Sequence, residues 1–452
     1  MRRPCCGVMA ALWIAANPAQ ASPQHLSPEQ GLLFAQELLA ANQPAAAQQV
    51  LAALAQARPK EAQVLILMSQ AQSALGQGRS AALAGKAAWQ LARSPAEQFA
   101  AAVVTARGQV LDHRLGAAGF WLRRAGQVAP SPQTHALAAQ DHAKLRQINP
   151  LSLRLTFAAA PSNNVNNGSS KATTSFEGLP FVFVLAPSAR ALSGIELTEK
   201  LSLSYRLAQS PQASTSLNLD LFARQARLSA QAKAAAPLAR GRDYGTAQIG
   251  LGLTHRWAAA TADGSHSASA NLSHSFLGGE AYAQHITLRY ERDWAMGRRD
   301  LVSAGFGLER VRYSPSGQTS YGQRLRGTWQ RHLPQKRALW LSAELSQIQS
   351  AAVLRAYDGV LTRAGYDFGK ITPKLGLTLG LEAEWRRYGV AGVHTGARQD
   401  HSHAIQADLS LQGLEYYGFV PVLNAEVSQT SSTVDLYNSA NAQIGISLKS
   451  SF

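Results

Sequence analysis

Residues 151–157 have the sequence Leu-Ser-Leu-Arg-Leu-Thr-Phe, in which every second side chain is apolar. Successive side chains of a β-strand point to opposite faces, so this alternation predicts a strand with one apolar and one polar face. The same pattern recurs at residues 201–207 (Leu-Ser-Leu-Ser-Tyr-Arg-Leu) and 217–221 (Leu-Asn-Leu-Asp-Leu). Alanine becomes less frequent after Pro150, whereas Ser, Thr, Tyr and Gly become more frequent. We therefore expect residues 150–452 to form a strand-rich domain.

About fourteen alternating segments follow one another in this domain, separated by turn residues such as Gly278-Gly279 and Ser316-Gly317. Besides the three above they are 247–257, 268–276, 286–290, 301–311, 339–348, 375–385, 405–411, 420–427 and 442–448, with looser alternation at 321–329 and 354–368. A strand that crosses an outer membrane needs about 9 to 11 residues, and regularly spaced turns are typical of hairpins. The segments are long enough for membrane-spanning hairpins.

The polar face of each segment carries Arg, Glu, Gln, Ser and Asn, which favours a closed barrel over an open sheet or a sandwich. An open sheet would leave two long unpaired edges, whereas a barrel turns its apolar face to lipid and its polar face to water. Aromatic residues near segment ends are candidates for girdles at the two membrane interfaces: Trp257, Trp294, Tyr313, Trp340, Tyr388, Tyr416 and Tyr417. The last alternating strand ends at Phe452, as in the signal that outer-membrane barrels present to their insertion machinery. Outer-membrane lipids and that machinery are expected partners.

Residues 22–149 are rich in Ala, Gln, Leu and Arg, which is helix composition. Two features recur with a period near 35 residues: a proline (Pro59, Pro95 and Pro130) and, seventeen residues earlier, a polar or glycine turn (Asn42, Gly78 and His113). Small residues follow each turn, as in tetratricopeptide repeats. We expect a tetratricopeptide-like solenoid in the periplasm, so that the fold class is α + β in two domains.

The solenoid serves either as a concave surface that binds a peptide or protein, or as a helical spacer. Phe34, Trp89 and Trp121 are the candidates for a cargo groove, and the alternative is that these rings are core residues.

The N-terminus has the pattern of a secretory signal peptide. Met1-Arg2-Arg3 is followed by an apolar run from Val8 to Ala16, and Ala19-Gln-Ala21 supplies a cleavage site before Ser22. An uncleaved anchor would need about 20 apolar residues. We assign residues 1–21 to the signal. Both cysteines, Cys5 and Cys6, fall within it, so we expect no disulfide and no thiolate metal site.

The chain is basic, with a formal net charge of +16, but its cations are scattered. No run of five or more Lys or Arg is present, so we do not expect nucleic-acid binding. A basic surface at an anionic membrane is the better interpretation.

Two motifs follow the first strand of the barrel. The first motif is Pro161-Ser-Asn-Asn-Val-Asn-Asn167, and the second is Ser188-Ala-Arg-Ala-Leu-Ser-Gly194. They resemble two sequence elements of the surface lipoprotein assembly modulator family, Pro-x-x-Asn-x-Asn and Ala-Arg-x-x-Ser-Gly. The matching positions are Pro161, Asn164, Asn166, Arg190, Ser193 and Gly194. The whole mature chain resembles this family in its layout of signal, short repeat domain and barrel.

The resemblance implies an outer-membrane translocator that delivers exported proteins, either lipoproteins or soluble haem- and metal-scavenging proteins, from periplasm to cell surface. It implies no catalytic residue and no cofactor. The alternative is a polysaccharide export porin with periplasmic repeats. An enzyme is not expected, because no Gly-x-Ser-x-Gly elbow is present and the best metal-like cluster, Asp400-His-Ser-His403, lacks an evident third ligand.

Overall fold

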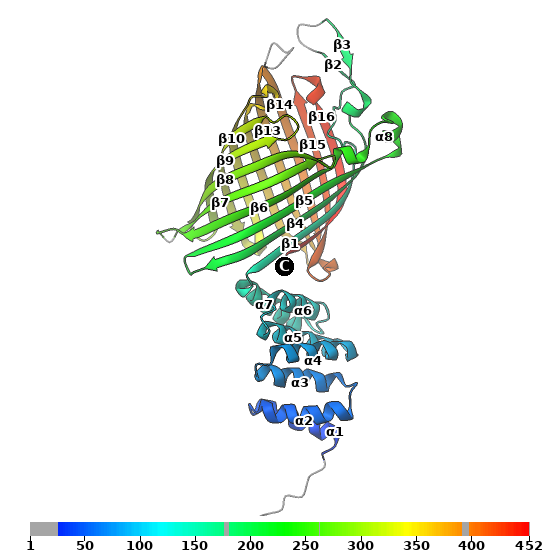
Figure 1. Cartoon of the computed structure of the whole chain (residues 1–452), viewed down its shortest axis with the longest axis vertical. Helices are drawn as coiled ribbons and strands as arrows, with labels where there is room; N and C mark the ends of the chain where they lie inside the picture. The colour runs from blue at the N-terminus through cyan, green and yellow to red at the C-terminus, as the bar shows by residue number, and fades with distance from the viewer. Residues whose placement is uncertain (1–25, 176–179, 262, 391–396, 452) are drawn as a thin grey trace, which may run out of the picture. The chain divides into compact units, whose positions relative to one another are not determined.

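The computed structural model describes residues 26–175, 180–261, 263–390 and 397–451, in which helices precede strands along the chain (Figure 1). The predicted signal, residues 1–21, and Phe452 lie outside the described residues. Within the described ranges, none of the helices combines the length and apolar character that a membrane span requires.

The helical part consists of short helices joined by tight turns. They are α1 (Pro28–Ala40), α2 (Pro44–Ala57), α3 (Ala62–Ala74), α4 (Gly78–Leu91), α5 (Pro95–Leu111), α6 (Leu115–Gln127) and α7 (Pro132–Ile148). Two predicted turn residues, Asn42 and His113, have a φ of 58°, the left-handed conformation that reverses the chain. Gly78 instead begins α4, and the left-handed residue of that turn is Gly76, with a φ of 73°.

Proline and serine mark where these helices begin. Pro95, one of the prolines that recur in the sequence, is the first residue of α5, where its missing N–H costs nothing. Ser94 caps the same helix, and the Glu97 side chain bonds back to the N–H groups of Arg93 (2.7 Å) and Ser94 (3.2 Å). Both backbone N–H groups stabilise the ionised carboxylate and so lower the pKa of Glu97. The bond from Arg93 has the larger effect.

Small side chains allow the helices to pack closely. Ala47, Ala81 and Ala118, one after each predicted turn, are all fully buried, which confirms the expected packing of small residues. Helices α4 and α5 approach each other closely. A Cβ atom added at Gly108 would lie 2.5 Å from the backbone N of Ala82, so the two backbones meet there.

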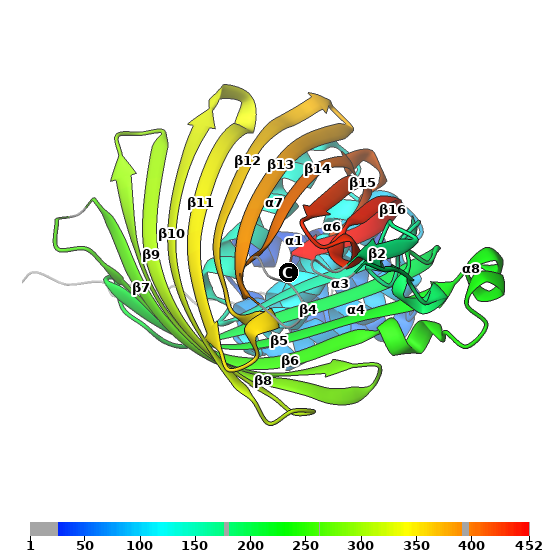
Figure 2. The same ribbon diagram turned by 90° about the horizontal axis from the view of Figure 1, so that it is seen from above.

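The strands from residue 151 onward form a closed antiparallel barrel of fourteen strands (Figure 2). They are β1 (Leu151–Ser162), β4 (Gly194–Gln209), β5 (Ala213–Leu228), β6 (Thr246–Ala258), β7 (Gly264–Leu277), β8 (Glu280–Met296), β9 (Asp300–Tyr313), β10 (Thr319–Leu333), β11 (Arg337–Ser350), β12 (Tyr357–Thr372), β13 (Leu375–Val390), β14 (Ala397–Leu411), β15 (Phe419–Ser432) and β16 (Ser439–Ser451). Each predicted segment overlaps one of these strands. Each strand pairs with its sequence neighbours, and β1 pairs with β16.

The connections differ at the two ends of the barrel. At one end, residues 163–193 and 229–245 form long connections that contain a small sheet of β2 (Thr173–Ser175) and β3 (Val182–Val184) and the helix α8 (Ala230–Ala235). At the other end the turns are short, as at residues 210–212, 297–299 and 373–374. We refer to these as the long-loop end and the short-turn end.

One face of the barrel wall is apolar and exposed, whereas the other is polar. Exposed apolar side chains occur around the wall, including Leu251, Leu308, Leu345, Leu381, Ile405 and Ile444. Since the alternation places these on one face, that face is the lipid-facing exterior and the polar face lines the lumen. Trp257 and Trp294 lie on the exterior, as a girdle requires. The prediction fails for three residues that face the lumen: Tyr313 shares that face with Glu309, Trp340 with Glu344, and Tyr388 with Glu384.

The close contact between α4 and α5 gives a stability prediction. The substitution Gly108→Ala should lower the thermal midpoint of the helical part by an amount equivalent to about 1–3 kcal/mol, because overpacking separates the backbones. Gly116→Ala is the control, since a Cβ there meets nothing within 4 Å. Circular dichroism at the helix band of the full chain measures both variants. Equal midpoints would contradict the packing described.

Candidate functional site

The lumen wall carries a chain of ion pairs that runs from β9 to β11. Arg324 on β10 bridges Glu309 (Nη2 to Oε2, 2.9 Å) and Glu344 (Nη1 to Oε1, 3.1 Å). Arg326 donates a further bond from Nε to Oε2 of Glu344 (2.9 Å). Glu344 is only 7% exposed, and both arginines bind its carboxylate within the wall. These paired glutamates and arginines form a charged surface on the lumen wall.

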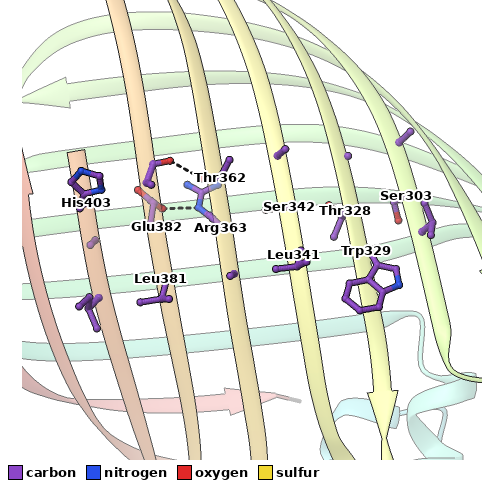
Figure 3. Close-up of a pocket in the computed structure, with 18 residues that line it drawn as sticks. Ser303, Thr328, Trp329, Leu341, Ser342, Thr362, Arg363, Leu381, Glu382 and His403 are labelled. Atoms are coloured by element: carbon purple, nitrogen blue, oxygen red, sulfur yellow. Dashed lines mark hydrogen bonds and ion pairs between the residues drawn. The ribbon is translucent and has the colours of Figure 1, made fainter. Parts of the chain in front are cut away.

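The ion pairs continue on β12 and β13. Arg363 donates from Nε to Oε2 of Glu382 at 2.6 Å, and Figure 3 shows the two side chains meeting between neighbouring strands. Arg386 binds Glu384 at 2.8 Å. Both glutamates lie on the lumen face. The lumen wall of this half of the barrel is therefore hydrophilic with balanced charges.

Two further arginines, Arg154 and Arg206, lie near the short-turn end. Arg154 on β1 is opposite Ser202 on β4, and it faces the lumen. Arg206 donates to the carbonyl oxygens of Gln147 (2.9 Å) and Asn149 (3.0 Å), which precede the barrel.

Glycines in β9 hollow out the same wall. Gly305 and Gly307 face the lumen beside Arg289 and Glu291 of β8, and together with the chain of ion pairs they border a hollow of about 310 Å³. Its rim presents guanidinium and carboxylate groups, which bind peptide groups and charged side chains by hydrogen bonds. The alternation of charged residues with apolar ones predicted that this face is polar. Which charges pair depends on the register between neighbouring strands, which the sequence did not reveal.

The two sequence motifs meet at the long-loop end, where β1 ends and β4 begins. Asn164 is 2% exposed, and its side chain spans a tight loop: Nδ2 donates to the carbonyl of Gly168 (2.9 Å), and Oδ1 accepts from Gly168 N–H (2.8 Å). Nδ2 also reaches the carbonyl of Ala440 on β16 (3.3 Å). One side chain therefore shapes the loop and attaches it to the last strand.

Asn166 joins the first motif to the second. Its Nδ2 donates to the carbonyl of Arg190 (2.7 Å), and its Oδ1 accepts from Leu192 N–H (2.8 Å). Ser193 then bonds Ser229 of the next long loop through the two hydroxyls (2.7 Å). The main chain of Arg190 and the side chains of Asn164, Asn166 and Ser193 thus build one structure, which we call the loop node.

A small apolar cluster lies within the loop node. Val165 is fully buried, and Leu192, Leu228 and Ala232 of α8 are each less than a tenth exposed around it. Gly194 opens β4 where a Cβ atom would collide with the carbonyl of Arg227. The glycine of the second motif is thus required by the close approach of β4 and β5.

The loop node also bonds the last loop of the barrel. Ser169 donates from its hydroxyl to the carbonyl of Asp435 (2.8 Å), and Tyr437 nearby stacks on Arg398 with 3.6 Å between the guanidinium carbon and the ring centre. Tyr388 covers the other face of that guanidinium (3.7 Å), whose Nη2 donates to Asp400 (2.8 Å). These contacts join β1, β4, β13, β14 and the β15–β16 connection into one firm rim.

Below the loop node, β1 and β16 close the barrel. Pairing runs from Arg154 opposite Ser451 to Ala159 opposite Ile446, and continues at Ser162 opposite Gln443. Pro161 in between has no N–H to give to the ladder. Gly445 lies so close to β1 that a Cβ would be 2.6 Å from that of Ala160. Pro161, the first motif position, thus interrupts the hydrogen bonding at this closure.

The three aromatic residues predicted for a cargo groove do not lie together. Trp89 and Trp121 form an edge-to-face pair with ring centres 5.6 Å apart, and Trp121 is only 7% exposed. These two rings pack between helices, as the alternative interpretation expects. Phe34 on α1 is 42% exposed and belongs to the surface.

The two histidines of the metal-like cluster lie together on β14. Both His401 and His403 are on one face of that strand, and that face is the exterior shared with Ile405. Across the residues that the structure describes, no group of three or more His, Cys, Asp or Glu side chains is arranged to hold a metal ion.

Comparison with known families gives one match. The model of the surface lipoprotein assembly modifier family matches residues 365–452, which include the end of β12 and strands β13–β16. The match lies apart from residues 161–194, on which the resemblance was based, and it confirms that resemblance from a second part of the chain. A closed barrel with a lipid-facing exterior and this match together identify an outer-membrane barrel.

Solved structures similar to this chain include two outer-membrane channels and the protein OccAB4. The channel DcaP of Acinetobacter baumannii has 11% identity and a TM-score of 0.40, covering 67% of this chain and 96% of its own. OccAB4 of Acinetobacter baumannii has 7% identity and a TM-score of 0.36, covering 67% and 99%. An outer membrane channel from Pseudomonas putida F1 has 9% identity and a TM-score of 0.34, covering 67% and 96%. No curated protein matches the chain.

The bonds of Asn166 give a prediction for the loop node. Asn166→Ala should make residues 163–193 more accessible to protease in the folded barrel, because the carbonyl groups of Ser188 and Arg190 and the N–H of Leu192 lose hydrogen bonds that contribute about 0.5–1.5 kcal/mol each. Asn167→Gly is the control, since Asn167 is exposed and its φ of 51° suits glycine. Limited proteolysis of the membrane-embedded chain measures the rate. Equal rates in both variants would show that Asn166 does not hold the loop.

Proposed function

We propose, taking the family match as the premise, that this chain is an outer-membrane translocator that delivers specific exported proteins from the periplasm to the cell surface. Its cargo would be surface lipoproteins or soluble haem- and metal-scavenging proteins. The observation that carries the proposal is the match of the last four strands to a surface lipoprotein assembly family, in a barrel whose lumen wall is lined by paired charges. We propose that it acts without catalysis and without a cofactor.

The orientation of the barrel follows from its connections. Outer-membrane barrels have short periplasmic turns and longer extracellular loops. On this basis the long-loop end, with the loop node, faces the cell exterior, and the helical part lies in the periplasm, where it would engage cargo. The predicted signal peptide, residues 1–21, would take the chain across the inner membrane.

The lumen wall is suited to a polypeptide in transit. An extended chain exposes backbone polar groups that need hydrogen-bond partners, and side chains of either charge. The wall offers hydrogen-bonding groups of both charges. Arg363 and Glu382, for example, are paired with each other, so neither presents an isolated charge. A balanced wall would let different sequences pass without trapping any of them. Folding of the cargo outside, or its lipid anchor, would supply the driving force.

The first test compares the surface of cells with and without this chain. We expect one or a few proteins to disappear from the protease-accessible and secreted fractions while their periplasmic levels persist. An unchanged protein profile would contradict the proposal, and the loss of a surface polysaccharide instead would favour the polysaccharide exporter.

The second test locates the route of the cargo with two adjacent positions of β11. Ser342 faces the lumen, and Leu341, which is 45% exposed, faces lipid. A photo-crosslinking amino acid at position 342 should capture cargo in transit, whereas the same group at position 341 should not. Capture at 341 alone would mean that cargo travels along the outside of the barrel.

A further inference from the structure

A polar patch covers the exterior of four neighbouring strands toward the long-loop end. Its members are exposed and lie on β8, β9, β10 and β11: Gln284, Arg310, Arg312, Tyr321, Gln323, Gln347 and Gln349. We call it the glutamine–arginine patch. The patch thus consists of two arginines, four amides and one phenol on the exterior. Nearer the short-turn end, the exterior of the same strands carries leucine.

The strand register makes these residues neighbours. Arg310 lies opposite Tyr321 on β10, and Tyr321 lies opposite Gln349 on β11. Arg312 lies opposite Gln284 on β8, and Gln323 opposite Gln347. Arg310 and Arg312 are two residues apart on one strand, which puts their Cα atoms about 7 Å apart on the same face. The patch is therefore continuous across the four strands.

The patch begins where the apolar band ends. Leu308, Leu325 and Leu345 are 44%, 54% and 52% exposed on the same face, and each is within two residues of a patch member on its own strand. In the orientation proposed above, this boundary is where the acyl chains of the outer leaflet give way to head groups. The patch is thus at head-group depth on the outside of the wall.

The polar groups of the patch are uncompensated within the described part of the chain. Its seven side chains make no hydrogen bond, ion pair or ring contact there. The lumen arginines differ, because Arg324, Arg326 and Arg363 are each bonded to glutamate. Two exposed guanidinium groups without an acid beside them leave a local positive charge.

We propose that the glutamine–arginine patch binds the head group of a phosphorylated glycolipid in the outer leaflet. The planar guanidinium groups of Arg310 and Arg312 each match a phosphate with two parallel hydrogen bonds. The four amides and the Tyr321 hydroxyl donate and accept hydrogen bonds, which suits the hydroxyl groups of sugars. A phospholipid would use the arginines but leave most of the amides without partners. The inference rests on the orientation in the proposed function.

The experiment uses the full chain purified in mild detergent and stripped of lipid. Binding of lipopolysaccharide, of phosphatidylglycerol and of inorganic phosphate is measured separately by titration. We expect lipopolysaccharide to bind most tightly, and the double variant Arg310→Gln/Arg312→Gln to bind it at least about tenfold more weakly. Gln347→Ala/Gln349→Ala should weaken lipopolysaccharide binding and leave phosphatidylglycerol unaffected.

The matched control is Arg240→Gln/Arg242→Gln, which removes the same charge from an exposed connection between β5 and β6. It should bind lipopolysaccharide as the unmodified chain does. Equal binding by the Arg310/Arg312 variant and this control would overturn the proposal. Equal affinity of the unmodified chain for all three probes would overturn the glycolipid and leave a general anion site. The heat-dependent gel shift of the barrel confirms that each variant is folded.

These outcomes are separate from those for cargo delivery, because the titration needs only the purified chain. Loss of surface proteins in cells tests the translocator proposal, whereas lipopolysaccharide binding tests the patch. If the chain delivers cargo but the patch binds no glycolipid, only the further inference fails.

Discussion

Lipid offers no hydrogen-bond partner to a peptide group, and this constraint determines the structure of the strand-rich domain. Each N–H and C=O within the hydrocarbon must be paired by a neighbouring strand, so the sheet cannot have an edge. The pairing of β1 with β16 removes the edge. Once the wall is closed, the alternation of side chains separates a lipid-facing surface from a lumen. The paired charges of the lumen wall are possible because the other face of the same strands carries the apolar residues.

Much of this architecture is local in sequence, and that part could be predicted. Alternation over 5 to 15 residues requires no knowledge of the partner strand, so all fourteen barrel strands were located. The aromatic girdle was assigned from nearness to segment ends, and that criterion does not fix the face of a side chain. Trp340 alternates with Leu341 and therefore faces the lumen, where Gly365 on the neighbouring strand leaves room for its ring. Tyr388 faces the lumen with Glu384, and Arg398 stacks on it there. Both partners are distant in sequence and meet only through the register.

The candidate site divides in the same way. The two motifs were close enough in sequence to be assigned to one region, and their residues do meet in the loop node. Their roles were not evident, because Asn164 and Asn166 act on backbone groups of other segments rather than on a ligand. The ion pairs of the lumen were also missed. Glu309, Arg324 and Glu344 lie on three strands, and only the observed register brings them into contact. In the helical part, Trp121 illustrates the same limit, since its burial depends on Trp89 of another helix.

The loop node has a consequence for the order of assembly. The hydroxyl of Ser169 and the carbonyl of Asp435 are 266 residues apart in the chain, and Asn164 and Ala440 are 276 apart. Contacts of such long range form late, because the entropy of closing a large loop must be overcome first. The node is therefore complete only when the first and last hairpins of the barrel are brought together, since they contribute its two halves. An intact node thus marks a barrel whose wall has closed.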